Sequence, residues 1–232
     1  MTRRLALIHT VPSLVPVFGG LTRELAPDVS TTDLVDEALL EDAIAAGEVP
    51  AATAERLEGH VRRALDEGAD AVLVTCSSMG GVVDDLRTRH GWPLLRVDEA
   101  MVDAALAAGS RIGVLATLSS TLRPTAELVR SRARELGSDD GSLEVVTRVV
   151  DGAFASLKAG DLDAHDDAVR AALRELIPQV DVIVLAQASM ARVAGTLDPD
   201  EAAATPILSS PRLGVERAAE LIDRLDADRA PG

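Results

Sequence analysis

Short apolar runs alternate along this chain with longer, alanine-rich amphipathic stretches. The runs are almost continuously apolar, as in strands buried on both faces of a parallel sheet. They predict strands at Leu5–His9, Ala71–Cys76, Leu94–Val97, Arg111–Ala116, Leu143–Arg148, Val182–Leu185 and Ile207–Ser209. The stretches between them predict helices at Asp33–Ala46, Ala51–Gly68, Gly81–Arg89, Glu99–Ala108, Thr121–Leu136, Asp163–Ile177 and Pro211–Leu225. This alternation is typical of an α/β fold with mostly parallel sheets.

Helix ends carry recognisable signals. The hydroxyls of Ser30, Thr31 and Thr32 precede the first predicted helix and are expected to cap its N-terminus. Gly68 and Gly109 stand just past two predicted helices, where a C-terminal glycine belongs.

The chain repeats itself in three places, in the same order and at similar separations. RRLALIHT, ending at Thr10, parallels SRIGVLAT, ending at Thr117. EGADAVLVTCSSMGGVVDDL parallels PQVDVIVLAQASMARVAGTL, and GWPLLRVDEAMVDAAL parallels ATPILSSPRLGVERAA. We therefore expect two similar, pseudo-symmetric halves, each a sheet flanked by helices: residues 1–108 with 211–232, and residues 109–210. In this prediction the last helix, after Pro211, returns to the first half.

Composition narrows the classes of ligand and location. With 38 acidic against 23 basic residues, the formal net charge is −15, which argues against nucleic acid and anionic membranes as partners. No run of about 18 apolar residues could span a bilayer. One Trp, two Phe and no Tyr cannot build a stacking platform for bases or flavins. A single cysteine forms no internal disulfide, so we expect a cytoplasmic protein with a small, polar ligand.

Polar residues gather where the predicted strands end. His9–Thr10, Cys76–Ser78, Thr117–Thr121 and Gln187–Ser189 each follow an apolar strand. Ligands of open α/β sheets bind at the carboxyl ends of strands. We therefore expect these four segments to meet in one cleft between the two halves.

Cys76 is the most reactive group among them. It precedes Gly80 and Gly81, which open a helix, and N–H groups at that helix start are expected to lower the pKa of the thiol. Hydroxyls nearby could bind a carboxylate and stabilise an enediolate, while the thiolate exchanges a proton with carbon. These donors are Ser77, Ser78, Thr117, Ser119, Thr121 and Ser189.

Each of these residues also has an ordinary structural interpretation. A lone cysteine is often a buried apolar residue, hydroxyls after strands often cap helices, and His9 could be a core histidine. His60, His90 and His165 fall in or beside predicted helices and are expected on their surfaces. The chain has no His/Cys spacing typical of zinc and no glycine-rich nucleotide loop. We therefore expect neither a metal nor a cofactor.

The pattern resembles the aspartate/glutamate/hydantoin racemase superfamily, which includes arylmalonate decarboxylase and maleate isomerase. The resemblance rests on TCSSMGG at Thr75–Gly81, LATLSST at Leu115–Thr121, VIVLAQASMA at Val182–Ala191, and Pro206 with GVERA at Gly214–Ala218. It implies two Rossmann-like halves with the active site in the cleft between them. It also implies a homo-oligomer and an enzyme that uses neither metal nor pyridoxal phosphate. The family's racemases place one cysteine in each half, on opposite faces of the substrate α-carbon.

This chain departs from that family pattern in the second half. Cys76 matches the first cysteine, but Gln187 stands where the second is expected. Glutamine has no titratable proton in the useful range, so the two-thiol mechanism does not carry over. Where the family's glutamate racemases carry an acidic residue after the first strand, this chain has His9 and Thr10.

Two versions of the active site remain open. In one, Cys76 works alone, as in the family's one-cysteine decarboxylase; that enzyme keeps the cysteine of the other half, so the protonated face would be opposite here. In the other, His9 is the second acid–base group. The leading hypothesis is a cofactor-independent racemase, epimerase or other isomerase acting on a small carboxylic acid through Cys76. Thr10 and the six hydroxyl donors would bind this substrate, and Gln187 would orient it. A decarboxylase of a malonate-like acid, with Cys76 as sole proton donor, and a non-catalytic carboxylate-binding protein are the alternatives.

Overall fold

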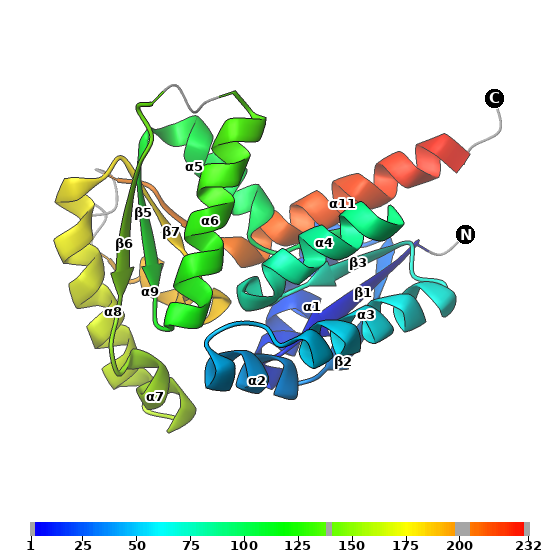
Figure 1. Cartoon of the computed structure of the whole chain (residues 1–232), viewed down its shortest axis with the longest axis horizontal. Helices are drawn as coiled ribbons and strands as arrows, with labels where there is room; N and C mark the ends of the chain where they lie inside the picture. The colour runs from blue at the N-terminus through cyan, green and yellow to red at the C-terminus, as the bar shows by residue number, and fades with distance from the viewer. Residues whose placement is uncertain (1–2, 138–140, 198–204, 230–232) are drawn as a thin grey trace. The chain divides into compact units, whose positions relative to one another are not determined.

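The computed structural model describes residues 3–137, 141–197 and 205–229, which form two compact units (Figure 1). The first unit comprises Met1–Val97 with Pro211–Gly232, and the second comprises Asp98–Ser210. Each is built on a four-stranded sheet in which every strand pair is parallel. The predicted α/β class with two similar halves is therefore confirmed.

The first unit has the strand order β2-β1-β3-β4. Its strands are β1 (Arg3–His9), β2 (Val29–Val35), β3 (Ala71–Val74) and β4 (Leu94–Arg96). Its helices are α1 (Val15–Leu25), α2 (Ala38–Ala46), α3 (Ala51–Asp66), α4 (Gly80–His90) and α11 (Ser210–Arg229). Short 3-10 turns precede α1 at Pro12–Leu14 (η1) and α4 at Ser77–Met79 (η2).

Strand order decides which helices share a face of this sheet. The chain moves outward from β1 to β2 and then returns past β1 to β3, so right-handed crossovers place α1 and α3 on opposite faces. Side chains of β1 alternate accordingly. His9 lies against Phe18 of α1, with ring centroids 5.6 Å apart, whereas Ala6 and Ile8 face α3.

The second unit repeats this plan, with the strand order β6-β5-β7-β8. Its strands are β5 (Arg111–Ala116), β6 (Glu144–Val149), β7 (Val182–Leu185) and β8 (Ile207–Ser209). Its helices are α5 (Glu99–Ala108), α6 (Ser119–Glu135), α7 (Ala153–Lys158), α8 (Leu162–Leu176) and α9 (Ala191–Ala194). Two 3-10 turns complete it, at Ile177–Gln179 (η3) and Ala188–Met190 (η4).

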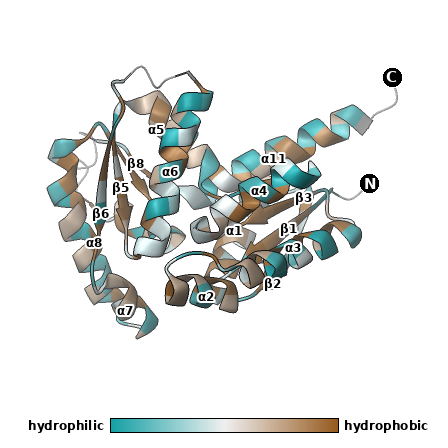
Figure 2. Cartoon of the chain, viewed as in Figure 1, coloured by the Kyte–Doolittle hydropathy of each residue, from teal (hydrophilic) through white to brown (hydrophobic). Residues whose placement is uncertain are grey.

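Apolar side chains fill the space between sheets and helices in each unit, and Figure 2 shows the strands brown beneath helices with teal outer faces. In the second unit one core cluster joins α8 and α9 to the sheet, with Val169, Leu173 and Leu185 fully buried. Only glycine fits at position 113 of β5 without a shift, because an added Cβ would lie 2.9 Å from the Leu176 side chain. Complementary packing of this kind fixes how α8 rests on β5.

Each of the two repeats contributes its last helix to the other unit. Helix α5 follows β4 along the chain, yet it packs on α6, β7 and β8 and groups with the second unit. Helix α11 follows β8, yet it groups with the first unit, where Arg3 pairs with Asp223 and Asp226. The sequence placed α5 in the first half and the boundary at residue 108, whereas the units divide after Val97. The pattern of apolar residues in the sequence predicted α5 but did not show which sheet it packs against.

The strand at Val29–Val35 corrects the predicted helix at Asp33–Ala46, which begins only at Ala38. Ser30, Thr31 and Thr32 lie within β2, pair with β1, and cap no helix. Because β2 is an edge strand with a half-exposed pattern, it lacks the apolar run that marks a buried strand. Gly68 has the left-handed φ of 90°, as predicted for a helix end, whereas Gly109 is fully extended at φ 179°.

No helix in the described part of the chain is long and apolar enough to cross a bilayer.

Candidate functional site

The cysteine lies in the loop between β3 and α4. Cys76 has an extended backbone, at φ −120° and ψ 112°, and the 3-10 turn that begins at Ser77 leads directly into α4. The residue is only 8% exposed. Four polar groups stabilise its thiolate form: the hydroxyls of Thr10 and Ser78, and the backbone N–H groups of Ser78 and Met79. The predicted helix-start donors are therefore present.

The net direction of the Cys76 pKa is nevertheless opposite to the prediction. Burial removes the thiolate from water and raises the pKa of Cys76 above its ordinary value, and the four donors offset only part of that effect. The sequence showed the donors but not the depth of burial. At neutral pH the resting group is therefore a thiol with its thiolate donors already in place.

His9 is held on both sides. Its imidazole is fully buried, with Nε2 3.0 Å from Asp33 Oδ1 and Nδ1 2.9 Å from Thr75 Oγ1. A carboxylate only accepts hydrogen bonds, so in the neutral ring Nε2 carries the proton and Nδ1 accepts from the Thr75 hydroxyl, which also lies 3.1 Å from the Ile8 carbonyl oxygen. Burial lowers the pKa of His9, although Asp33 acts in the opposite direction. The resting ring is therefore neutral and fixed in one tautomer.

The chain Asp33–His9–Thr75 ends one residue before Cys76. The strand register brings it together, because Leu7 pairs with Asp33 on one side of β1 and Ile8 pairs with Val74 on the other. The Thr75 N–H also donates to the Ile8 carbonyl at 2.9 Å. His9 thus holds Thr75 in place by a hydrogen bond, at the end of the strand that leads to Cys76.

The second unit has a polar cluster at the equivalent place. Gln187 follows β7 as Cys76 follows β3, and its backbone is nearly the same, at φ −133° and ψ 135°. Each is followed by a 3-10 turn, and the Met190 and Met79 N–H groups donate to the carbonyls of Gln187 and Cys76, both at 3.1 Å. The two strand–turn–helix segments are structural counterparts within the duplicated chain.

Thr117 fixes the side chain of Gln187. The Thr117 N–H and hydroxyl lie 2.6 and 3.0 Å from Gln187 Oε1. An N–H donor requires the amide oxygen on that side, so the Gln187 NH₂ group points away from Thr117. Among the described residues it has no hydrogen-bond partner within the protein, which leaves two donors for a ligand.

The other predicted ligand-binding hydroxyls differ in burial. Ser77, Ser78, Thr117 and Thr121 are buried, Ser189 is half-buried, and Ser119 is exposed. Thr10 and Ser78 are joined to Cys76, and Thr117 to Gln187. Within the described residues no side-chain hydrogen bond joins Ser77, Ser119 or Ser189 to either cluster.

Four polar residues with buried contacts or unpartnered buried atoms were not singled out from the sequence. Asp33 was assigned to a helix and Thr75 to a strand core, so their contacts with His9 had no sequence signal. Ser120 has a buried Oγ without a hydrogen-bond partner in the structure. His165 was expected on a surface but is fully buried, with Nδ1 2.7 Å from Asp166 and Nε2 unpartnered.

No group of three or more His, Cys, Asp or Glu side chains within residues 3–137, 141–197 and 205–229 is arranged to hold a metal ion. The side chains described above around Cys76 and Gln187 contribute a thiol, hydroxyls, amides and one imidazole held in place by hydrogen bonds.

Known structures share this fold. An allantoin racemase from Klebsiella pneumoniae is similar with a TM-score of 0.65 and 19% identity, covering 98% of this chain and 89% of that one. A glutamate racemase isoform from Bacillus anthracis gives 0.68 and 18%, covering 97% and 82%. A mutant of arylmalonate decarboxylase in its liganded form gives 0.63 and 19%, covering 95% and 93%. The fold is thus the two-unit α/β fold of racemases and of this decarboxylase.

The sequence profile of the Asp/Glu/hydantoin racemase family matches residues 14–218. This chain therefore belongs to the Asp/Glu/hydantoin racemase family, as the resemblance indicated. A search of curated proteins gave no match.

Proposed function

We propose that this protein is a cofactor-independent isomerase, a racemase or epimerase, that moves a proton at the α-carbon of a small carboxylic acid through Cys76. The donor set around the cysteine carries this proposal. Thr10, Ser78 and the Met79 N–H are arranged to stabilise a negative charge on sulfur, a property that an ordinary core cysteine does not need. Family membership supports the reaction class.

The proposed step is a balanced proton transfer. The Cys76 thiolate removes the α-proton, the electrons of the C–H bond pass into the substrate carboxylate, and an enediolate forms with the proton on sulfur. The enediolate then takes a proton on its other face. We assign that second proton to water, because Asp33 and Thr75 already occupy both ring nitrogens of His9. The hydroxide that remains takes the proton from the Cys76 thiol, which restores water and the thiolate. His9 is proposed as a positioning residue rather than as the second acid–base group.

Substrate binding is assigned to neutral donors. Gln187 presents an NH₂ group whose orientation Thr117 fixes, and this group is proposed to bind the substrate carboxylate. Ser77, Ser119, Thr121 and Ser189 remain proposed as further donors to the same substrate. Neutral donors of this kind favour an enediolate, because they strengthen as charge moves onto the carboxylate oxygens.

Decarboxylation is the second candidate, and the resting state of the cysteine favours it. Loss of CO₂ from a malonate-like acid leaves its electron pair as an enediolate, and a single thiol then delivers one proton to carbon. Burial keeps Cys76 protonated, which is the form this step requires. Gln187 offers no second proton, and this reaction needs none.

The test uses the full chain in D₂O with aspartate, glutamate and methylmalonate as probes. For the isomerase, ¹H NMR is expected to show loss of the α-proton signal of an amino acid, together with loss of optical rotation. For the decarboxylase, CO₂ is expected to be released, and the ¹H NMR signals of methylmalonate are expected to be replaced by those of propionate carrying one deuterium from the solvent at the α-carbon. Both activities are expected to disappear in Cys76→Ala and to fall sharply in Cys76→Ser.

Gln187→Ala tests the second unit, with Gln179→Ala as its matched control because Gln179 is an exposed glutamine in the 3-10 turn η3. We expect the first variant to raise KM or lower kcat at least tenfold, and the control to be unchanged. Binding of these acids with neither exchange nor CO₂ release would instead support the non-catalytic alternative. Activity retained in Cys76→Ala would contradict the assignment of the cysteine.

A further inference from the structure

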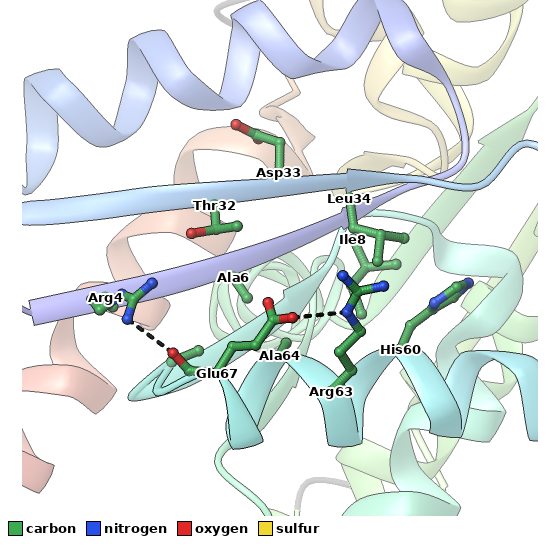
Figure 3. Close-up of a pocket in the computed structure, with 11 residues that line it drawn as sticks. Arg4, Ala6, Ile8, Thr32, Asp33, Leu34, His60, Arg63, Ala64 and Glu67 are labelled. Carbon is green, nitrogen blue, oxygen red and sulfur yellow. Dashed lines mark hydrogen bonds and ion pairs between the residues drawn. The ribbon is translucent and has the colours of Figure 1, made fainter.

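A cavity lies in the first unit, between α3 and the face of β1 and β2 on the same side of the sheet (Figure 3). Its volume is about 320 Å³, within the range of small-molecule sites. Its lining comes from β1, β2, α3 and the loop that follows α3, and it shares no residue with the Cys76 loop. The lining is Arg4, Ala6, Ile8, Thr32, Asp33, Leu34, His60, Arg63, Ala64, Glu67 and Ala69.

The space exists because α3 packs toward β3 and leaves the β2 side of the sheet uncovered. The positions of α3 buried in the unit's core are Thr53, Leu57 and Val61. The neighbouring stripe of His60, Arg63, Ala64 and Glu67 follows helical spacing and faces the cavity. Small side chains at Ala6, Ala64 and Ala69 leave the floor and wall unfilled.

Of the three basic side chains that line the cavity, Arg63 and His60 each have a carboxylate partner and Arg4 differs. Arg63 Nε pairs with Glu67 Oε1 at 2.8 Å, and His60 Nε2 lies 2.8 Å from Asp36 Oδ2. Asp33 points to the other side of β2, where it binds His9 (Figure 3). Arg4 is different, because its guanidinium donates only to the backbone carbonyl of Glu67, at 2.9 Å.

Among the described residues no ion pair joins the Arg4 guanidinium to a carboxylate, although the Arg4 backbone N–H donates to Asp70 Oδ2 at 2.9 Å. Arg4 therefore brings a positive charge to the cavity, in a chain whose net charge is −15. A guanidinium binds a carboxylate through two parallel N–H donors. Beyond Arg4, the floor is the apolar surface of Ala6, Ile8 and Leu34. A ligand that fits both features is a monoanion with a short aliphatic body.

We propose that this cavity is a binding site for an aliphatic carboxylate of four to eight carbons, separate from the site at Cys76. The carboxylate binds Arg4, and the chain lies against Ala6, Ile8, Leu34 and Ala64. The Thr32 hydroxyl, which points toward the cavity in Figure 3, is available as a further donor.

The experiment is a titration of the full-length ¹⁵N-labelled protein with hexanoate, followed by NMR. Saturable shifts are expected at the amides of residues 32–34, 64 and 69. Hexan-1-ol, which has the same chain without the charge, is expected to bind at least tenfold more weakly. Cys76→Ser is expected to bind hexanoate as the wild type does, which separates this site from the proposed catalytic one.

Two variants and their matched controls test the geometry. Arg4→Gln is expected to weaken binding about tenfold, whereas Arg62→Gln, on α3 outside the lining, leaves it unchanged. Ala64→Leu fills the cavity and is expected to abolish binding, whereas Ala52→Leu, exposed on the same helix, does not. Circular dichroism checks that each variant folds. If Ala64→Leu fails to fold, Arg4→Gln still tests the proposal, because Arg4 is exposed and its replacement is not expected to disturb the core.

Three results would overturn the proposal. They are shifts that do not saturate, equal affinity for hexanoate and hexan-1-ol, or shifts confined to residues 10 and 76–79. The last would show that hexanoate occupies the Cys76 loop alone. Because the experiment measures binding of hexanoate, its result does not depend on whether Cys76 is catalytically active.

Discussion

At the scale of single residues, Cys76 shows two opposed effects on one group. Burial disfavours the thiolate, and four donors favour it without reversing the balance. The donors gain strength only when the thiol gives up its proton. Cys76 is therefore set up as a proton donor at rest, and it becomes a base only at a pH that overcomes the burial effect.

This balance predicts opposite pH profiles for the two candidate reactions. If the thiolate starts the reaction, as in the isomerase, kcat/KM is expected to rise with pH toward the raised pKa of Cys76. If the thiol delivers the proton, as in the decarboxylase, kcat/KM is expected to be flat and then fall as the thiol ionises. Initial rates between pH 6 and 10 measure the profile. An isomerase rate independent of pH across this range would contradict the role of Cys76 as the base.

His9 gives a prediction about stability. Its pKa is lowered in the folded protein, so the unfolded chain binds a proton first as the pH falls below about 6.5. The free energy of unfolding is therefore expected to decrease from that pH downward until the folded-state pKa is reached. Urea unfolding between pH 7.5 and 5 measures the slope, and His9→Gln is expected to make it smaller.

The imidazole signal of His9 provides an independent measurement. Its Hε1 resonance is expected to titrate below pH 6.5, whereas a midpoint above this value would contradict the neutral resting state.

At the scale of elements, the β3–α4 and β7–α9 connections have one backbone design. In both, an extended residue follows the strand, a 3-10 turn comes next, and a methionine leads into the helix. The first connection also packs closely on a buried arginine. Arg96 is 4% exposed, pairs with Asp84, and lies against the backbone of Gly80 at the start of α4.

Gly80 and its neighbour make a matched pair of substitutions. A Cβ at Gly80 would overlap the guanidinium of Arg96, whereas a Cβ at Gly81 would have no neighbour within 4 Å. Gly80→Ala is therefore expected to lower the free energy of unfolding by about 1–3 kcal/mol. Gly81→Ala is expected to raise it by up to about 1 kcal/mol, because alanine favours the helix. Equal effects of the two variants in urea unfolding would contradict the packing described here.

At the scale of the whole molecule, the duplicated halves exchange their terminal helices. Helix α11 completes the first unit, where it buries Val215, Ala218 and Ile222. Gly214 lies close to the chain there, since an added Cβ would be 3.0 Å from the Val97 carbonyl. The first unit therefore depends on residues more than 100 positions away in the sequence.

That dependence predicts that a change in α11 destabilises the unit containing Trp92. Ile222→Ala removes a side chain that is 1% exposed and is expected to cost about 2–5 kcal/mol. Trp92 is the sole tryptophan, so its fluorescence during urea unfolding reports on the first unit. Leu162→Ala, at a position 48% exposed, is the control and is expected to shift the midpoint little. An unchanged Trp92 transition in Ile222→Ala would contradict the assignment of α11.

The sequence by itself determined the elements with strong internal patterns. Arg111–Ala116, Val182–Leu185, Ile207–Ser209 and Glu99–Ala108 have the predicted bounds, because a buried strand or helix must be apolar along its own length. The internal repeat also predicted that Cys76 and Gln187 occupy matching positions, and their backbone angles agree. Each of these features depends either on a short stretch of sequence or on the internal repeat, and both can be read from the sequence alone.

Tertiary structure decided what depends on partners distant in sequence. The polar edge strand β2 exists because it pairs with β1, and only that pairing brings Asp33 to His9. Helix α5 joins the second unit because its apolar face fits α6 and β7. The direction of the Cys76 pKa follows from its depth of burial, which no neighbour in sequence reveals. The sequence alone showed which reactive groups are present, namely the Cys76 thiol and the His9 imidazole. Their burial and their contacts with residues distant in sequence decided the protonation state of each group.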